Sequence, residues 1–310
     1  MKILITGGAG YIGSMLVPEL LNLNHKITVL DNFMFKQASL NSFCSNINFE
    51  IINGDIRNQN LMKKLVNEND IIIPLAAIVG APLCNKDPYN AQSINYDAIK
   101  DMFTYVSKNQ YIIMPTTNSA YGTGDKNNFC NEESPLRPIS KYAKDKVEIE
   151  KDLMSRENSI SYRLATVFGM SPRMRIDLLV NDFTYRAYHD SALIIFEGHF
   201  KRNYIHVKDV VRAFIHALTN LDKMKSEIYN VGLSEANLSK KELCEEIKKH
   251  IPNFTYVEEK IKKDPDQRNY IVSNEKIEKS GFIPKYSLSD GIKELIKGYS
   301  MIKNQNFGNF

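Results

Sequence analysis

Residues 1–14, MKILITGGAGYIGS, place a short apolar run directly before a cluster of glycines. Residues 2–6 are rich in β-branched and aliphatic side chains, which is typical of a buried parallel strand. Glycine allows a tight turn and lets the backbone approach a pyrophosphate closely. The helix that we expect from about residue 12 directs its N-terminal amides and dipole towards a phosphate. The segment therefore predicts a dinucleotide-binding strand–turn–helix.

A second expected strand, residues 26–30, is followed directly by Asp31. An acid about 20 residues past the glycines is placed to bond both hydroxyls of an adenosine ribose. Because its negative charge repels a 2′-phosphate, Asp31 favours NAD over NADP as the cofactor.

Composition limits the class of protein. The 310 residues can bury a large core, as one α/β unit or as two lobes, and the hydrophobic share is 43%. The net charge of +4 is small, and the basic residues alternate with acids, which argues against a nucleic-acid partner. The four cysteines show no CxxC spacing, so we expect no metal site, no disulfide framework and a reducing cytoplasmic location. No apolar run is long enough to predict a membrane helix.

Strand and helix patterns alternate through the first half of the chain. Strands are expected at 3–6, 27–30, 49–53, 71–75, 111–114 and 161–165, and helices at about 12–23, 58–67, 90–107 and 139–156. This alternation predicts an α/β fold with a doubly wound parallel (Rossmann) sheet and a smaller C-terminal α/β lobe. We assign residues 1–168, with 202–233 returning to them, to the dinucleotide-binding domain, and 169–201 and 234–310 to the smaller lobe.

Tyr142 and Lys146 are the expected catalytic pair. A spacing of four puts both side chains on one face of a helix. We expect the lysine cation to lower the tyrosine pKa from about 10 towards the working pH, so that the phenolate takes a proton from a substrate hydroxyl while hydride leaves the same carbon. The YxxxK pattern alone is common on exposed helices, but downstream of a dinucleotide fingerprint it indicates catalysis.

Residues 115–122, PTTNSAYG, follow an expected strand and so lie at a carboxyl end of the sheet, where ligands bind in this class of fold. Their hydroxyl groups are placed to orient a substrate alcohol beside Tyr142. The alternative is a Ser/Thr-rich turn that bonds only its own backbone.

These motifs together resemble the extended short-chain dehydrogenase/reductase family, whose members act on nucleotide-activated sugars, and the resemblance covers nearly the whole chain. It implies an NAD-dependent enzyme whose smaller lobe binds the sugar nucleotide, with Thr117, Tyr142 and Lys146 as catalytic residues. The implied cofactor contacts are Gly7, Gly10, Tyr11, Ile12, Gly13, Asp31, Asn32, Asp55, Ile56, Leu75, Ala76, Ala77, Asn95, Tyr142 and Lys146. The implied substrate contacts are Asn118, Ser119, Asn181, Arg202 and Arg268.

The chain departs from the family pattern at informative places. The 4,6-dehydratases of the family follow the active threonine with an Asp-Glu pair that carries protons, whereas Asn118 and Ser119 do not titrate. Elimination of water therefore lacks its acid and base. Residues 170 and 171 are inserted before Pro172, and the Arg173–Arg175 run that follows either reaches towards the nucleotide or is solvated.

Within the family, residues 75–88, 115–122 and 266–270 resemble the GDP-manno-heptose 4-dehydrogenases of bacterial capsule heptose pathways. We therefore expect NAD-dependent oxidation of GDP-D-glycero-manno-heptose at C4 by a homodimer, with helices near 93–107 and 139–155 at the dimer interface. A 4-epimerase and a 4-keto-sugar reductase would use the same residues and stay open. A cofactor-sensing regulator is disfavoured, because it needs no proton-transfer set.

Overall fold

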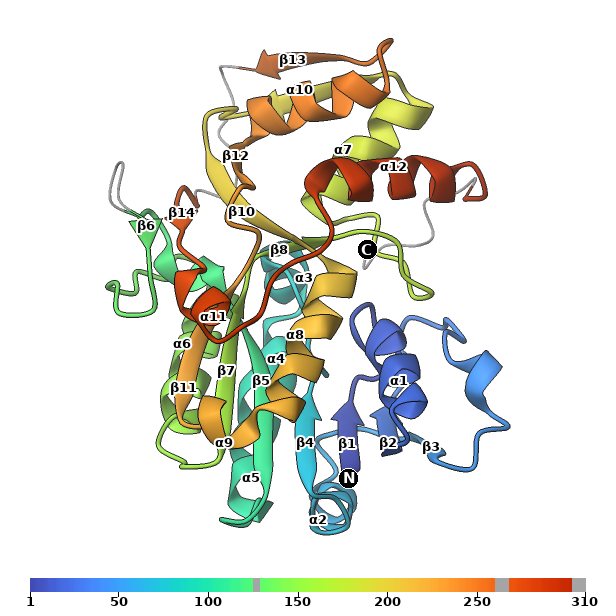
Figure 1. The fold of residues 1–310 in the computed structure, drawn as a ribbon, viewed down its shortest axis with the longest axis vertical. Helices are drawn as coiled ribbons and strands as arrows, with labels where there is room; N and C mark the ends of the chain where they lie inside the picture. The colour runs from blue at the N-terminus through green and yellow to red at the C-terminus, as the bar shows by residue number, and fades with distance from the viewer. Residues whose placement is uncertain (125–128, 260–267, 303–310) are drawn as a thin grey trace.

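The computed structural model describes residues 1–124, 129–259 and 268–302 (Figure 1). Within these residues the main sheet has seven strands in the order β11-β7-β5-β4-β1-β2-β3, and all of its pairings are parallel. The strands are β1 (Lys2–Thr6), β2 (Lys26–Asp31), β3 (Phe49–Asn53), β4 (Ile71–Pro74), β5 (Tyr111–Thr117), β7 (Ser159–Leu164) and β11 (Glu227–Val231). The predicted doubly wound α/β fold is confirmed.

Helices cover both faces of this sheet. One face packs against α1 (Gly13–Asn22), α8 (Val207–Thr219) and α9 (Leu221–Met224), and the other against α2 (Gln59–Asn67), α5 (Ala98–Tyr105) and α6 (Lys141–Leu153). Ile3 and Ile5 belong to the first core and Leu4 to the second, because successive side chains of a strand point to opposite faces. Burial on both faces explains why β1 reads as a continuous apolar run.

A separate core lies above the sheet in Figure 1. It gathers side chains from α7 (Leu179–His189), β9 (Ala192–Phe196), β10 (Lys201–His206), α10 (Lys240–His250) and α12 (Leu288–Tyr299). Capping boxes at Ser239 and Ser287 satisfy the first amides of α10 and α12 and set where these helices begin. None of the described helices is both long and apolar enough to cross a membrane.

The remaining elements connect these two parts. Residues 81–105 form α3 (Ala81–Lys86), α4 (Pro88–Gln92) and a π-helical turn that leads into α5. Smaller sheets pair β10 with β8 (Thr166–Phe168) and β12 (Asn237–Ser239), β13 (Thr255–Glu259) with β9, and β14 (Ile271–Val272) with β6 (Phe129–Cys130).

Two segments lie in a different part from the one expected. Residues 202–233 were expected to return to the dinucleotide-binding domain, but β10 pairs with β8 and β12 instead of joining the main sheet, although Ile205 of β10, α8, α9 and β11 all contribute to the large core. Conversely, α11 (Glu275–Lys279) was assigned to the smaller lobe, but it contacts β11, and Ile277 is buried in the large core. The local sequence of a short strand or helix carries no signal for which sheet or core it joins, so pattern alone could not decide these placements.

The turn between β1 and α1 has no room for side chains. A Cβ atom on Gly13 would lie 2.4 Å from the Gly8 carbonyl oxygen, and one on Gly7 would lie 2.5 Å from the Ala76 amide nitrogen. Gly7 also has a φ of +68°, which side chains disfavour. These close approaches hold the start of α1 against the loop and hold the loop against the end of β4.

We expect Gly13→Ala to destabilise the protein, because its methyl group would push α1 away from the rigid backbone of Gly8. Overpacking of this kind costs roughly 1–3 kcal/mol, and urea unfolding measures the loss. Glu19→Ala, at an exposed position of the same helix, is the control and should change stability little. Unchanged stability of the Gly13 variant would contradict the packing argument.

Candidate active site

A cavity of about 860 Å³ opens at the carboxyl edge of the sheet and continues under the smaller lobe. β1 lies between β2 and β4, so the chain leaves the sheet in opposite directions on the two sides of this point. Such a switch point is where open α/β folds bind ligands. The cavity is lined both by the glycine turn and by lobe residues such as Arg202 and Lys240, so one space can hold two ligands side by side.

The glycine turn fits a pyrophosphate. The nearest atom to a Cβ on Gly10 would be the Gly7 carbonyl oxygen at 3.0 Å, so the other side of Gly10 is open to the cavity. No side chain caps the start of α1 at Ile12, which leaves its first amides directed towards that space. Gly7, Gly10, Tyr11, Ile12 and Gly13, the expected cofactor contacts of this turn, all line the cavity.

Asp31 ends β2 at the cavity wall. Its carboxylate accepts hydrogen bonds from the amides of Ala9 at 3.0 Å and Phe33 at 2.8 Å, which fix its orientation. Burial raises the pKa of Asp31, and these amide bonds oppose the rise. Asn32, Asp55 and Ile56 line the same wall. The Arg57 guanidinium bonds Asp55 and lowers the pKa of that carboxyl group.

Leu75, Ala76 and Ala77 line the cavity, but Asn95 does not. The Asn95 amide donates to the Ile78 carbonyl and accepts from the Ile78 amide, both at 2.8 Å, and only 1% of the residue is exposed. The predicted cofactor contact by Asn95 is therefore wrong. Asn95 holds the backbone that follows β4, because the π-helical turn directs its side chain towards Ile78.

The three predicted catalytic residues line one cavity. Thr117 ends β5; its hydroxyl donates to Ser119 Oγ at 2.9 Å and accepts from the Ser119 amide at 3.1 Å. Tyr142 and Lys146 project from α6, whose start is capped by Ser140. The Thr/Ser turn therefore makes the local bonds of the alternative interpretation and also faces the ligand space.

Burial is the largest influence on the pKa values of Tyr142 and Lys146. It raises the pKa of Tyr142 to about 12 and lowers that of Lys146 to about 8. The positive charges that lower the Tyr142 pKa are those of Arg175 and Arg268, and Lys146 is not among them. The prediction that Lys146 lowers the pKa of Tyr142 therefore does not hold in this structure, where burial raises that pKa and only the two arginines oppose the rise.

The predicted substrate contacts divide into two groups. Ser119, Arg202 and Arg268 line the cavity. Arg202 is 2% exposed and lies over the Tyr270 ring, 5.7 Å from its centroid. Arg268 donates to Ser119 Oγ, so it lies beside Thr117 and Tyr142. This places Arg268 at the reacting end of the cavity, whereas residues 266 and 267 of its motif lie outside the described residues.

Asn118 and Asn181 do not line the cavity, which corrects their assignment as substrate contacts. The Asn181 amide accepts from the Gly169 amide and donates to the Arg175 carbonyl, so its polar atoms are used in holding the 169–175 segment. Asn118 is 1% exposed, and neither of its amide atoms bonds a described residue.

Arg173 and Arg175, which the sequence alone allows either at the nucleotide or in solvent, are both buried, at 2% and 8% exposure. Both line the cavity, and Arg175 pairs with Asp177 through Nη2–Oδ2 at 2.5 Å. No local pattern signals this placement, since Met174 between them is also buried, at 1% exposure. Among the described residues no cluster of His, Cys, Asp or Glu is arranged to hold a metal ion.

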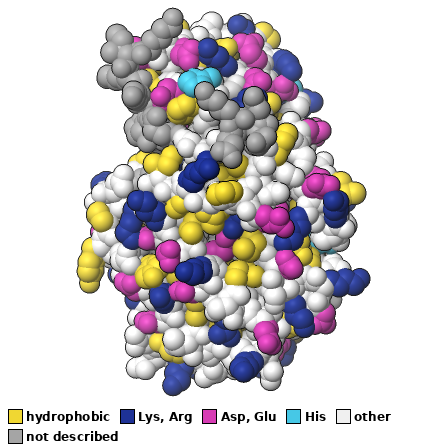
Figure 2. Space-filling view, turned by 90° about the vertical axis from the view of Figure 1, so that its left-hand side faces the viewer, with side chains coloured by type: hydrophobic (Ala, Val, Ile, Leu, Met, Phe, Trp, Pro, Cys, Tyr) yellow, Lys and Arg dark blue, Asp and Glu magenta, His cyan; other side chains and the backbone are white. Residues whose placement is uncertain are grey.

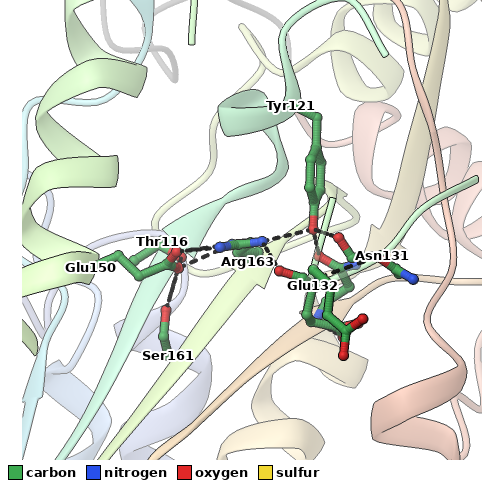
Figure 3. Close-up of polar contacts among 9 residues, drawn as sticks. Thr116, Tyr121, Asn131, Glu132, Glu150, Ser161 and Arg163 are labelled. Atoms are coloured by element: carbon green, nitrogen blue, oxygen red, sulfur yellow. Dashed lines mark hydrogen bonds and ion pairs between the residues drawn. The ribbon is translucent and has the colours of Figure 1, made fainter. Parts of the chain in front are cut away.

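A buried network supports the catalytic helix (Figure 3). The Glu150 carboxylate accepts from Thr116 at 2.8 Å, from Ser161 at 2.7 Å and from Arg163 Nη2 at 2.6 Å. Arg163 also donates to the Tyr121 hydroxyl at 3.0 Å. Glu150 lies on α6, Thr116 on β5 and Arg163 on β7, so this carboxylate joins the helix of Tyr142 to the strand of Thr117.

The fold and the cavity define a dinucleotide-dependent enzyme with a second ligand space beside the cofactor cleft. The profile of the NAD dependent epimerase/dehydratase family matches residues 3–232, and the chain belongs to that family. NAD is therefore its cofactor, and the glycine turn and Asp31 are the residues that fit it.

Relatives of the chain are similar over their full length. A UDP-N-acetyl-alpha-D-glucosaminuronate decarboxylase of Bacillus cytotoxicus is 27% identical, over 98% of this chain and 99% of the relative. A putative UDP-glucose 4-epimerase of Methanocaldococcus jannaschii is also 27% identical, over 98% and 99%. The solved UDP-glucose 4-epimerase of Thermotoga maritima has a TM-score of 0.83 at 26% identity and covers 98% of this chain and 100% of its own.

Replacement of Glu150 by Met should destabilise the protein strongly. The Arg163 guanidinium would remain buried without its carboxylate, at a cost of roughly 3–5 kcal/mol in unfolding free energy. The double variant Glu150→Met/Arg163→Met removes both charges and should recover much of that loss in urea unfolding.

Glu227→Gln, which breaks an exposed pair with Lys276, is the matched control and should cost about 1 kcal/mol or less. A double variant that is less stable than Glu150→Met would contradict the argument.

Lys146→Met should stabilise the protein at pH 7. The pKa of Lys146 in the folded protein is about 8, below its ordinary value of 10.5. Between these two pH values the unfolded chain therefore binds a proton that the folded protein does not bind. The stability of the native protein therefore rises with pH across that window, and the burial cost is fully present below pH 8.

The gain from Lys146→Met is on the order of 3 kcal/mol at pH 7 and shrinks towards pH 10.5. Urea unfolding at several pH values measures it, and Lys151→Met, an exposed lysine of the same helix, is the control. A gain that is the same at every pH would disprove the burial cost.

Proposed function

We propose that this protein oxidises C4 of a nucleotide-activated sugar with NAD and releases the 4-keto sugar nucleotide. The substrate that we propose is GDP-D-glycero-manno-heptose, and the pathway is capsule polysaccharide biosynthesis. The observation that carries the proposal is the meeting of Thr117, Tyr142 and Lys146 in one cavity with the glycine turn. The sequence adds Asn118 and Ser119 where the dehydratases that the chain resembles have an Asp-Glu pair. The heptose and its GDP carrier rest on the resemblance of residues 75–88, 115–122 and 266–270.

The chemistry follows from the arrangement of the side chains. The Tyr142 phenolate accepts the proton of the C4 hydroxyl, while the Thr117 hydroxyl orients the same oxygen. NAD, when bound, supplies the acceptor for the hydride that leaves C4. Burial raises the pKa of Tyr142 to about 12, and the charges of Arg175 and Arg268 oppose this rise and so favour the phenolate. Neither Asn118 nor Ser119 can then remove or deliver a second proton for elimination.

A 4-epimerase is the second candidate. The relatives at 27% and 26% identity that are named UDP-glucose 4-epimerases support it. An epimerase would use the same three residues and return the hydride to the opposite face of the ketone. A 4-keto-sugar reductase would run the same step in reverse.

Product analysis separates these candidates. The purified protein is incubated with NAD and GDP-D-glycero-manno-heptose, or with UDP- and dTDP-sugars, while the absorbance of the reduced nicotinamide is followed. We expect a 4-keto product together with reduced cofactor. A C4 epimer without net reduction would replace the proposal by the epimerase.

Tyr142→Phe should abolish turnover and leave NAD bound, because the phenol oxygen is the proposed base and the ring is kept. The bound cofactor is measured by calorimetry. Tyr89→Phe, at a tyrosine that is 80% exposed, is the control. Full activity of Tyr142→Phe would disprove the mechanism.

We also propose a cytoplasmic homodimer that binds no nucleic acid. The helices expected at its interface are α5, with the turn before it, and α6. Figure 2 shows basic and acidic side chains interspersed over the face that it draws, which supports the absence of a polyanion-binding surface there. Light scattering tests the oligomeric state, and a monomer at assay concentrations would contradict the dimer.

A further inference from the structure

One segment of the chain crosses from the smaller lobe to the glycine turn. The Tyr11 hydroxyl donates to the Gly169 carbonyl at 2.6 Å, and the Ser171 hydroxyl donates to the Tyr11 carbonyl at 2.8 Å. Ser171 Oγ also lies 2.9 Å from Ser14 Oγ in the first turn of α1. The Arg173 amide donates to the same Ser14 oxygen at 3.4 Å. The backbone of Arg173 is thereby anchored beside the start of the helix that faces the phosphate site.

The Arg173 side chain lies in the cavity wall on the cofactor side. Its guanidinium carbon is 4.0 Å from the centroid of the Phe35 ring, and both residues line the cavity. Phe35 belongs to the segment that follows β2 and Asp31. Phe33 and Lys36, on either side of it, have φ values of 51° and 53°, so the backbone adopts a strained turn around Phe35. Strain of this kind is common at ligand clamps.

Arg173 also keeps its positive charge in this buried position. Asp31 and Asp177 favour its charged form, while burial and the charge of Arg175 lower its pKa to about 10. Arg173 therefore stays positive at neutral pH although it is 2% exposed. A buried guanidinium binds phosphate oxygens well, because it is planar, weakly hydrated and carries several donors.

We propose that Arg173 is a cofactor-binding residue supplied by the smaller lobe, which closes with Phe35 over the adenosine diphosphate half of NAD and donates to its pyrophosphate. Asp31 marks the ribose, and the glycine turn with the start of α1 marks the pyrophosphate. Arg173 is anchored to that helix through Ser14 and stacked on the segment that follows Asp31. NAD or NADH then leaves only when the contact between Arg173 and Phe35 opens, so cofactor release is slow.

The release of NADH tests this directly and needs no sugar nucleotide, so its outcome is independent of the proposed function. The chain contains no tryptophan, so no indole emission overlaps NADH fluorescence. Protein loaded with NADH is mixed with excess ADP-ribose, and the loss of bound NADH fluorescence gives the dissociation rate constant. Calorimetry gives the affinity for ADP-ribose itself.

We expect Arg173→Ala to raise the NADH dissociation rate constant by about tenfold or more and to weaken ADP-ribose binding by a similar factor. Arg173→Lys, which keeps the charge but loses the planar group, should fall between this variant and the native protein. Phe35→Ala should also release NADH faster. The double variant should raise the NADH dissociation rate constant by less than the product of the two single fold-changes, because the two side chains act together.

Arg212→Ala is the matched control, since Arg212 also lies over a phenylalanine ring, that of Phe282 at 5.7 Å, and does not line the cavity. Thermal unfolding of each variant confirms that it is folded. If Arg173→Ala does not fold, Phe35→Ala and Arg173→Lys carry the same test. Native rates and affinities in the folded variants, or an equal effect of Arg212→Ala, would overturn the proposal.

Discussion

The close contact between Gly7 and the backbone that follows β4 is the constraint on which the rest of this site depends. The Gly7 amide donates to the Leu30 carbonyl at 2.8 Å, so the turn is tied to β2 on one side and pressed against Ala76 on the other. Any side chain at Gly7 would separate the ends of β1 and β4 and fill the crevice between them. The absence of side chains at this point is what leaves room for a dinucleotide at the edge of a fully packed sheet.

The catalytic residues depend on a second contact deeper in the fold. Tyr142, Lys146 and Glu150 repeat every four residues, so one face of α6 carries the two catalytic side chains and the carboxylate that holds the helix. Through Glu150 the helix is bonded to β5 next to Thr117 and to Arg163 on β7 (Figure 3). A shift of α6 would break several buried hydrogen bonds at once, and so the geometry of the site is protected by the stability of the core.

The smaller lobe contributes to both ends of the cavity. Arg173 lies against Phe35 on the cofactor side, whereas Arg175, two residues later, lowers the pKa of Tyr142 on the reacting side. The ordinary expectation for a Tyr–Lys pair is that the lysine lowers the pKa of the phenol, but here the charges that lower the pKa of Tyr142 are those of Arg175 and Arg268. Ser171, in the insertion of residues 170 and 171, donates to the Tyr11 carbonyl of the glycine turn. This bond holds the segment so that Arg173 lies on the cofactor side of the cavity and Arg175 on the reacting side.

The sequence by itself determined the α/β class, the order of most strands and helices, the NAD-type turn with Asp31, and the three residues proposed as catalytic. Each of these rests on a local pattern: a buried strand, glycines at fixed offsets, or a spacing of four on one helix. The tertiary structure alone decided that β10 leaves the main sheet, that Asn95 and Asn181 support backbone instead of contacting ligands, and that Arg173 and Arg175 are buried in the cavity wall. Those outcomes depend on partners between 6 and about 160 positions away along the chain, and burial and charge at such distances are properties of packing that no local pattern records.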